Sequence, residues 1–193
     1  MIRYKLDRLH KTIGHNQQIP CSTLQPNAPW TPPKLPFLTI NCDGSFDPNT
    51  GLTGTSCILR DFAGTWRGCA ANCYAEIRDV EQPECLALLA VRWSKMMQLT
   101  DLIFETDLKN IADYINKASP VIAWENEGIL LDVLVVLKSF QCWECKYIPR
   151  VCNKVADMLA KFSRRFRISK VWSDAPPNII EEQLLLDNLH SLA

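Results

Sequence analysis

Hydrophobic and polar positions begin to follow a regular pattern at Phe37. From 38 to 43 apolar and polar residues alternate, which predicts a half-buried strand. A DPNTG turn at 47–51 follows, and β-favouring runs at 55–60 and 65–73, separated by a short turn, predict two more strands. We therefore expect the patterned region to begin with an antiparallel three-stranded meander.

The apolar spacing changes to three and four residues after this meander, which predicts a helix. Pro83 suits the first position of that helix, and the periodicity continues to about Gln98. A short apolar strand, two helices and a fifth strand are then expected at 102–106, 108–117, 124–140 and 143–148. Asn153 is a natural cap for a last helix that ends near Phe166. The order of elements predicts an α/β fold, with a mixed sheet and helices packed on it.

The patterned region is flanked by two segments of different character. Residues 1–36 are basic and rich in proline, so we expect an N-terminal extension or linker. Residues 37–166 then form the folded domain. Residues 167–193 form a C-terminal tail with a short amphipathic helix at 179–189, which either packs on the domain or docks a partner.

Composition narrows the class of protein. The chain has 193 residues, of which 47 % are hydrophobic and 22 % charged, as in globular proteins. No apolar run reaches the roughly 20 residues that span a bilayer. The first residues lack the apolar core of a signal peptide. Nine cysteines, an odd number without regular spacing, favour reduced thiols. We therefore expect an intracellular protein of the nucleus or cytoplasm that is neither secreted nor membrane-bound.

Charge is unevenly distributed, although 21 basic residues balance 21 acidic ones. Residues 150–170 carry seven basic side chains against Asp157 alone, while 37–149 are acidic. One concentrated basic stretch on an acidic body is typical of a protein that binds a polyanion on one face. A solvated helix surface explains the same stretch equally well.

Four carboxylates stand where predicted elements begin or end: Asp43, Glu84, Asp107 and Asp157. Ligand sites form outside the carboxyl ends of parallel strands, so acids from neighbouring elements can converge there around a hard cation. Each acid also has a structural interpretation. Glu84 complements a helix dipole, Asp157 pairs with Lys161 at i, i+4, Asp107 caps the next helix, and Asp43 belongs to a turn.

Five segments together resemble the type-one ribonuclease H family. They are LTINCDGSF (38–46), CILRDFAGTW (57–66), ECLALLAVRW (84–93), IFETDLKNIADYI (103–115) and YIPRVCNKVADMLAKFS (147–163). Within that family the chain is most similar to the ribonuclease H-like domains of plant non-LTR retroelements, whose short tail the segment WSDAPPNIIEEQLLLDN (172–188) also resembles. The resemblance covers about residues 37–166.

The resemblance implies a five-stranded mixed sheet, with an antiparallel meander and later strands parallel to the first. It also implies an endonuclease that hydrolyses the RNA strand of RNA–DNA hybrids by a two-metal mechanism. The four acids Asp43, Glu84, Asp107 and Asp157 would be catalytic and would hold two Mg²⁺ ions, for which Mn²⁺ can substitute.

The same resemblance bears on substrate contacts. Gly44 and Ser45, in a loop after the first strand, and Lys154, Lys161 and Arg164, on the face of Asp157, are expected to contact nucleic acid. The expected partners are an RNA–DNA hybrid or double-stranded RNA, with no obligate protein partner, and the protein is expected to be a monomer.

One departure from the family leaves an alternative open. No histidine lies between His15 and His190, and Tyr147 stands where plant relatives often have histidine. The alternative is a relic or domesticated module that binds nucleic acid with weak or no catalysis.

Overall fold

A single mixed sheet forms the centre of the molecule. The structure is a computed structural model, and it describes residues 29–77, 79–117 and 121–191. Its strands are β1 (Leu38–Asp47), β2 (Leu52–Arg60), β3 (Trp66–Tyr74), β4 (Asp101–Thr106), β5 (Cys142–Tyr147) and β6 (Lys170–Trp172). In space they follow the order β5-β4-β1-β2-β3-β6. The meander β1–β2–β3 is antiparallel, whereas β4 is parallel to β1 and β5 is parallel to β4. The predicted mixed α/β sheet is confirmed.

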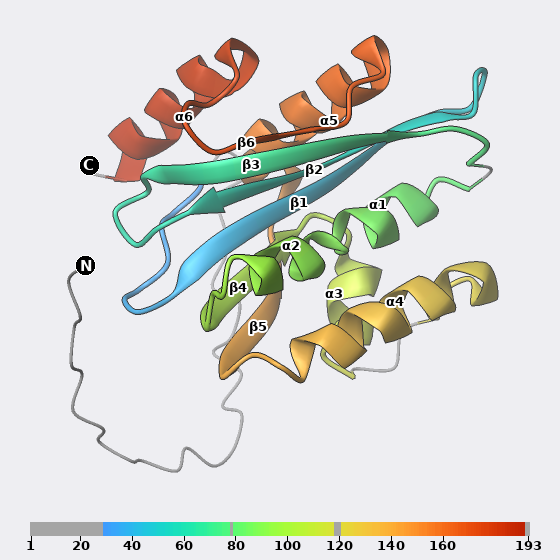
Figure 1. Cartoon of the computed structure of the whole chain (residues 1–193), viewed down its shortest axis with the longest axis horizontal. Coiled ribbons are helices and arrows are strands. Elements are labelled where there is room, and N and C mark those ends of the chain that lie inside the picture. The colour runs from blue at the N-terminus through green and yellow to red at the C-terminus, as the bar shows by residue number, and fades with distance from the viewer. Residues whose placement is uncertain (1–28, 78, 118–120, 192–193) are drawn as a thin grey trace.

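Helices cover both faces of this sheet. They are α1 (Gln82–Ala87), α2 (Ala90–Met96), α3 (Lys109–Ile115), α4 (Trp124–Leu137), α5 (Lys154–Phe166) and α6 (Asn178–Ser191), with a 3₁₀ turn, η1, at Arg150–Cys152. Figure 1 shows α5 and α6 above the sheet and α1, α2 and α4 below it. Each face therefore buries its own apolar core, and the larger core lies between the sheet and α1, α2 and α4. No helix in the described ranges is long and apolar enough to cross a membrane.

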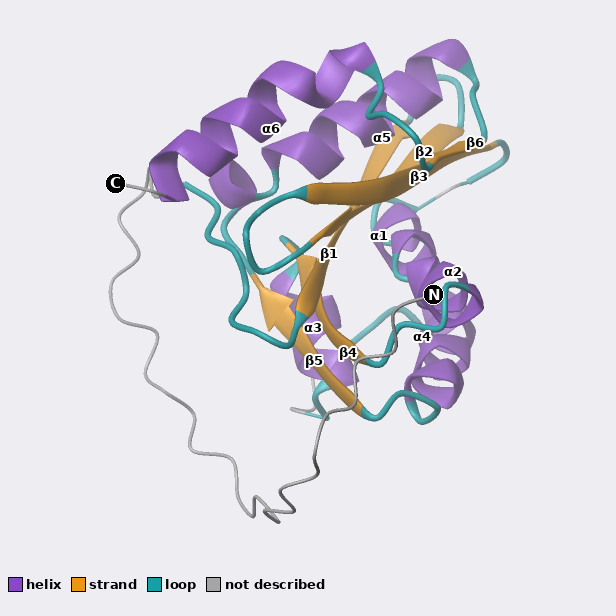
Figure 2. Ribbon diagram, turned by 60° about the vertical axis from the view of Figure 1, so that its left-hand side comes forward, coloured by secondary structure: helices purple, strands orange, loops and turns teal. Residues whose placement is uncertain are grey.

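The predicted number of strands was wrong by one. β6 comes from the C-terminal tail and pairs antiparallel with β3, with Val171 opposite Ala70. An alternating pattern cannot be recognised in three residues, so the sequence offers no signal for this strand. The tail then continues into α6, which lies beside α5 in Figure 2 and buries Ile180 and Leu184 against the domain.

The single helix predicted from Pro83 to Gln98 is two helices in the structure. The amide of Leu89 bonds to the carbonyl of Leu86 at 3.0 Å, and that of Val91 to Leu88 at 3.1 Å. These bonds from residue i to i−3 tighten the chain into a 3₁₀ turn between α1 and α2. The two residues of this turn, Leu88 and Leu89, both favour helix, so the periodicity alone does not reveal the break.

The two ends of the described chain meet at a buried polar network. Trp30 is 1 % exposed and donates from Nε1 to Glu105 Oε2 at 2.8 Å. The guanidinium of Arg60 lies 3.3 Å from the centre of the Trp30 ring and bonds Asp187 of α6 at 2.7 Å. Asn41 donates to Glu105 at 2.7 Å and accepts from Arg60. Trp30, from the predicted extension, thus packs on the domain, while residues 1–28 lie outside the described part.

Candidate active site

Three of the four predicted acids meet at the carboxyl end of β4. Asp43 is on β1, Glu84 is in the first turn of α1, and Asp107 directly follows β4. One carboxylate oxygen of each lies within 4.8 Å of the others. Because β1 and β4 are neighbouring parallel strands, their topology brings Asp43 and Asp107 together. The sequence prediction that acids from separate elements converge is confirmed for this group.

Gly44 allows α1 to approach β1 closely enough for Glu84 to join the group. Its backbone N–H donates to Glu84 Oε2 at 3.2 Å. A Cβ atom at this position would lie 2.5 Å from the carbonyl carbon of Pro83 and 2.6 Å from the amide nitrogen of Glu84. Both are backbone atoms that cannot move without shifting the helix. Glycine is therefore required here by close approach.

The substitution Gly44→Ala is expected to destabilise the protein by about 1–3 kcal/mol, the usual cost of overpacking. It should also lower activity, because α1 and Glu84 must move away from β1. Chemical denaturation measures the first effect and an activity assay the second. Gly128→Ala is the matched control, since nothing lies within 4 Å of a Cβ there and alanine favours the helix. Equal stability of the two variants would contradict the close-approach argument.

Burial and mutual repulsion make this group electrostatically unfavourable without a cation. Burial is the main cause that raises the pKa of Asp43 well above its ordinary value, followed by repulsion from Glu84 and Asp107. Burial, and then Asp107, raises the pKa of Glu84 to about 8. Burial also raises the pKa of Asp107. The three carboxylates therefore resist simultaneous ionisation.

The donor set fits a hard divalent cation. Asp43 is 2 % exposed, and its Oδ2 atom has no hydrogen-bond partner among the described residues. A buried carboxylate oxygen without a partner is costly, and a bound ion would satisfy it. Carboxylate oxygens are also the ligands that Mg²⁺ and Mn²⁺ prefer. Asp43, Glu84 and Asp107 can thus hold a divalent ion.

The fourth predicted acid, Asp157, lies in the first turn of α5 and its oxygens contact two cations. Its Oδ1 lies 3.3 Å from a terminal nitrogen of Arg150, and its Oδ2 lies 2.7 Å from Lys161 Nζ. The i, i+4 pair with Lys161, which was the structural interpretation from the sequence, is present. Asp157 is nevertheless close enough to the other acids to raise the pKa of Asp43.

Two residues of the site were not recognised from the sequence. Asn153, predicted as a helix cap, makes no side-chain cap hydrogen bond. Its Nδ2 donates instead to the carbonyl of Cys42 at 2.9 Å and lies 3.5 Å from Asp43 Oδ1, so it positions Asp43. Arg150 was counted in the basic stretch but not predicted as a site residue, and its Nε lies 3.9 Å from Asp107 Oδ2. The contacts of Asn153 with Cys42 and Asp43 span 111 and 110 positions, and the contact of Arg150 with Asp107 joins two separate elements, so no local pattern reveals them.

The five predicted nucleic-acid contacts are placed differently from one another. Gly44 and Ser45 belong to β1, which continues to Asp47, so the expectation of a loop there was wrong. Lys154 is exposed at the start of α5. Lys161 pairs with Asp157, and Arg164 donates to the carbonyl of Phe46 at 2.5 Å.

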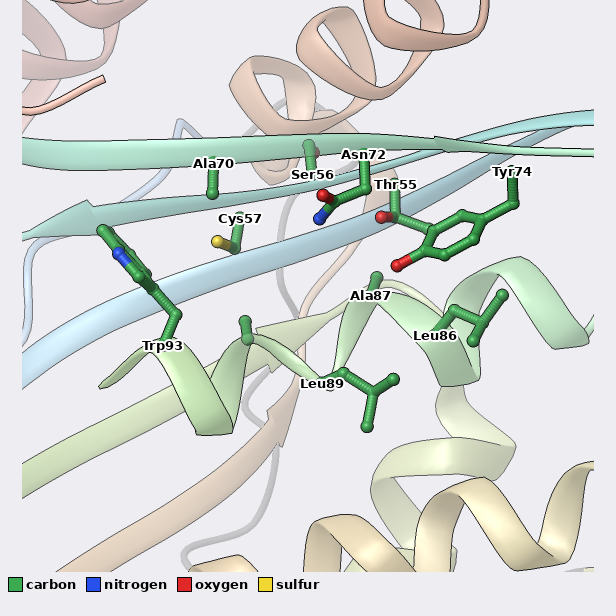
Figure 3. A pocket seen from close by; sticks show the side chains of 11 residues that line it. Thr55, Ser56, Cys57, Ala70, Asn72, Tyr74, Leu86, Ala87, Leu89 and Trp93 are labelled. Atoms are coloured by element: carbon green, nitrogen blue, oxygen red, sulfur yellow. The ribbon is translucent and has the colours of Figure 1, made fainter. Parts of the chain in front are cut away.

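A small pocket lies apart from the acids, between the sheet and the α1–α2 pair. Figure 3 shows Thr55, Asn72 and Tyr74 projecting from the sheet toward Leu86 and Trp93. Its volume is about 80 Å³, and none of the four acids lines it. Ligand pockets for drug-sized molecules measure about 300–1,000 Å³. The acidic group, and not this pocket, is the candidate site.

Comparisons with known proteins identify the fold. Residues 41–163 match the sequence profile of the family described as reverse transcriptase-like. RNase H1 from the halophilic archaeon Halobacterium salinarum NRC-1 superposes with a TM-score of 0.62 at 18 % identity, covering 68 % of this chain and 99 % of that one. LC11-RNase H1, solved in complex with an RNA/DNA hybrid, gives 0.62 at 18 % identity, covering 67 % and 98 %.

A third solved structure agrees with these two. The N-terminal RNase H domain of a Mycobacterium tuberculosis protein gives a TM-score of 0.62 at 17 % identity, covering 67 % of this chain and 94 % of that one. No curated protein sequence matches. At these identities the solved structures establish an RNase H-like fold, and the profile match, which spans more than half of the chain, establishes that the protein belongs to the reverse transcriptase-like family.

Proposed function

We propose that the protein is a divalent-metal-dependent endonuclease that hydrolyses the RNA strand of RNA–DNA hybrids. The observation that carries the proposal is the convergence of Asp43, Glu84 and Asp107 around a buried oxygen that has no hydrogen-bond partner within the described part of the chain. The RNase H-like fold supports it, as does the hybrid bound to LC11-RNase H1.

Each of the four acids has a distinct role in this proposal. Two bound Mg²⁺ or Mn²⁺ ions would supply an activated water and stabilise the leaving oxygen of an in-line phosphodiester displacement. Asp43 would contact both ions, Glu84 and Asp107 one of them, and Asp157 the other. Asn153 holds Asp43 in place, and the N–H of Gly44 holds Glu84.

Substrate recognition would depend on the shape and the 2′-hydroxyls of the hybrid rather than on its sequence. Glu84 and the β1 residues Gly44 and Ser45 would contact the RNA strand beside the acids, since Gly44 bonds Glu84 directly. The exposed Lys154, at the start of α5, is placed to contact a phosphate. Such contacts orient the duplex without reading bases.

The decisive test is cleavage of an end-labelled RNA–DNA hybrid by the full chain with Mg²⁺ or Mn²⁺. We expect cuts in the RNA strand that leave 5′-phosphate and 3′-hydroxyl ends, no cuts in a DNA duplex of the same sequence, and no cuts with EDTA. Asp107→Asn is the control, because it removes one ligand of the proposed ion. Equal cleavage by this variant would reject the proposal.

A second candidate function is a module that binds hybrid or double-stranded RNA without cutting it. Tyr147, at the end of β5, favours this candidate because it stands where plant relatives often have histidine. So does the contact of Asp157 with two cations. Tight, salt-sensitive binding without metal-dependent products would identify this function.

The finer affiliation is also a proposal. We infer an origin in a plant non-LTR retroelement, supported by the order of the five motif segments and by the tail segment at 172–188. We further propose a monomeric protein of the nucleus or cytoplasm.

A further inference from the structure

The carboxylate of Asp157 differs from the other three acids in having a cation at each oxygen. Arg150 approaches Oδ1 at 3.3 Å and Lys161 approaches Oδ2 at 2.7 Å. Arg150 also extends toward Asp107, at 3.9 Å. Asp43, by contrast, keeps an oxygen that has no hydrogen-bond partner among the described residues. The four acids thus differ in how far their charge is balanced: Asp43 and Glu84 have no ion pair among the described residues, Asp107 has one long contact with Arg150, and Asp157 has two cations.

Both cations can leave Asp157 at small cost. The side chain of Arg150 is 72 % exposed and that of Lys161 is 52 % exposed, whereas Asp157 is 17 % exposed. Ion pairs with so much solvent contact are weak and are screened by salt. A group with more negative charge than one carboxylate, such as the phosphate backbone of a nucleic acid, competes well for them.

Arg150 and Lys161 lie on either side of Asp157 along the chain. Arg150 is in η1, directly before α5, and Lys161 is one helical turn beyond Asp157. They therefore approach the carboxylate from opposite sides along the chain, and both side chains are exposed beside the acids.

We propose that Arg150 and Lys161 form a counter-ion pair that closes Asp157 to a second divalent ion until the phosphates of a bound nucleic acid draw the two cations away. This inference rests on the proposed function. It makes the first ion, at Asp43, Glu84 and Asp107, independent of substrate. The second ion then binds well only when substrate is present, so the complete two-ion site assembles on the hybrid.

Mn²⁺ titration of the full chain, followed by the EPR signal of free Mn²⁺, tests the proposal without any cleavage. We expect the wild type to bind one Mn²⁺ more tightly than a second. In Arg150→Gln/Lys161→Gln the second Mn²⁺ should bind about tenfold more tightly, because the two weak ion pairs no longer compete with it for Asp157. The affinity for the first Mn²⁺ should change less. A non-cleavable hybrid with 2′-fluoro-modified RNA should tighten the second Mn²⁺ in the wild type.

The matched control is Arg165→Gln/Lys170→Gln, which removes the same two charges from exposed positions at the end of α5 and on β6. If the control variant binds the second Mn²⁺ as tightly as Arg150→Gln/Lys161→Gln does, the loss of any two positive charges explains the effect and the proposal is rejected. Unchanged affinity in Arg150→Gln/Lys161→Gln, with circular dichroism showing a folded protein, rejects it as well. A protein that shows the expected Mn²⁺ shift yet never cleaves hybrid would refute the proposed function and leave this inference standing.

Discussion

Replacing Asp43 by asparagine is expected to abolish hybrid cleavage and, at the same time, to raise the thermal stability of the metal-free protein. Loss of a carboxylate that would hold the proposed ions should reduce the rate by about a thousandfold or more, in the range seen when one essential electrostatic group is removed. Stability should rise because the folded wild type must keep a proton on a carboxyl group that is 2 % exposed beside Glu84 and Asp107, at a pH where the unfolded chain releases that proton.

The sign of the pH dependence follows from the pKa of this carboxyl. Burial and the neighbouring acids raise the pKa of Asp43 from 3.8 to about 10. The folded protein therefore binds a proton that the unfolded chain has already released, and stability falls as the pH rises above about 4. At neutral pH the cost is on the order of a few kcal/mol. Asparagine removes this dependence.

Thermal unfolding in EDTA from pH 5 to pH 9 measures the effect. The wild-type Tm should fall with pH more steeply than that of Asp43→Asn, and Mn²⁺ should raise the Tm of the wild type alone. Asp47→Asn is the control on the same strand, where an amide from Asn49 lowers the pKa of the carboxyl and no gain in stability is expected. A lower Tm for Asp43→Asn than for the wild type in EDTA would contradict the argument.

The substitution Arg60→Ala is expected to destabilise the protein by about 3–5 kcal/mol, the usual cost of removing one partner of a buried ion pair. Arg60 is 1 % exposed, its guanidinium bonds Asp187 at 2.7 Å, and it covers the ring of Trp30. Without it, Asp187 and Glu105 are left in the interior with fewer partners. Burial already raises the pKa of Glu105, which shows how poorly this region tolerates a negative charge.

Urea denaturation at neutral pH measures this loss. Arg92→Ala is the matched control, because Arg92 is 56 % exposed and pairs with Asp132, which is 62 % exposed, so a loss below about 1 kcal/mol is expected. Adding Asp187→Asn to Arg60→Ala should recover part of the stability, since the unpaired charge is gone. Equal losses in the two single variants would show that the buried network is not a major contributor.

Periodicity and turn residues predicted the meander and most of the helices, because each of these segments is long enough to repeat its own pattern. Glu84 and Asp107 could be predicted because they stand at element ends, where topology brings distant residues together, whereas Asp43 lies within β1. Asn153 shows the limit. A cap residue and a residue that donates to Asp43 look the same in sequence, and only the packing of α5 against β1 decides between them.

The charged residues show a second limit. The basic stretch at 150–170 was identified, but its side chains have different roles in the structure. Arg150 and Lys161 contact acids, Arg164 bonds a strand carbonyl, and Lys154 is exposed. The pairing of Arg60 with Asp187 spans 127 positions, and no local pattern indicates that an arginine will be buried. Such contacts depend on the tertiary fold.

The strand β6 has a consequence for how copies of this protein behave in solution. An outer strand presents unpaired backbone groups to which another chain can add, a common route to aggregation. Here β6 occupies the outer side of β3 from Cys69 to Ala71, and the hydroxyl of Ser169 accepts from the amide of Cys73 at 3.0 Å. At the opposite edge, β5 carries the exposed charges of Glu144 and Lys146. The tail thus protects one border of the sheet against self-association, as charge protects the other.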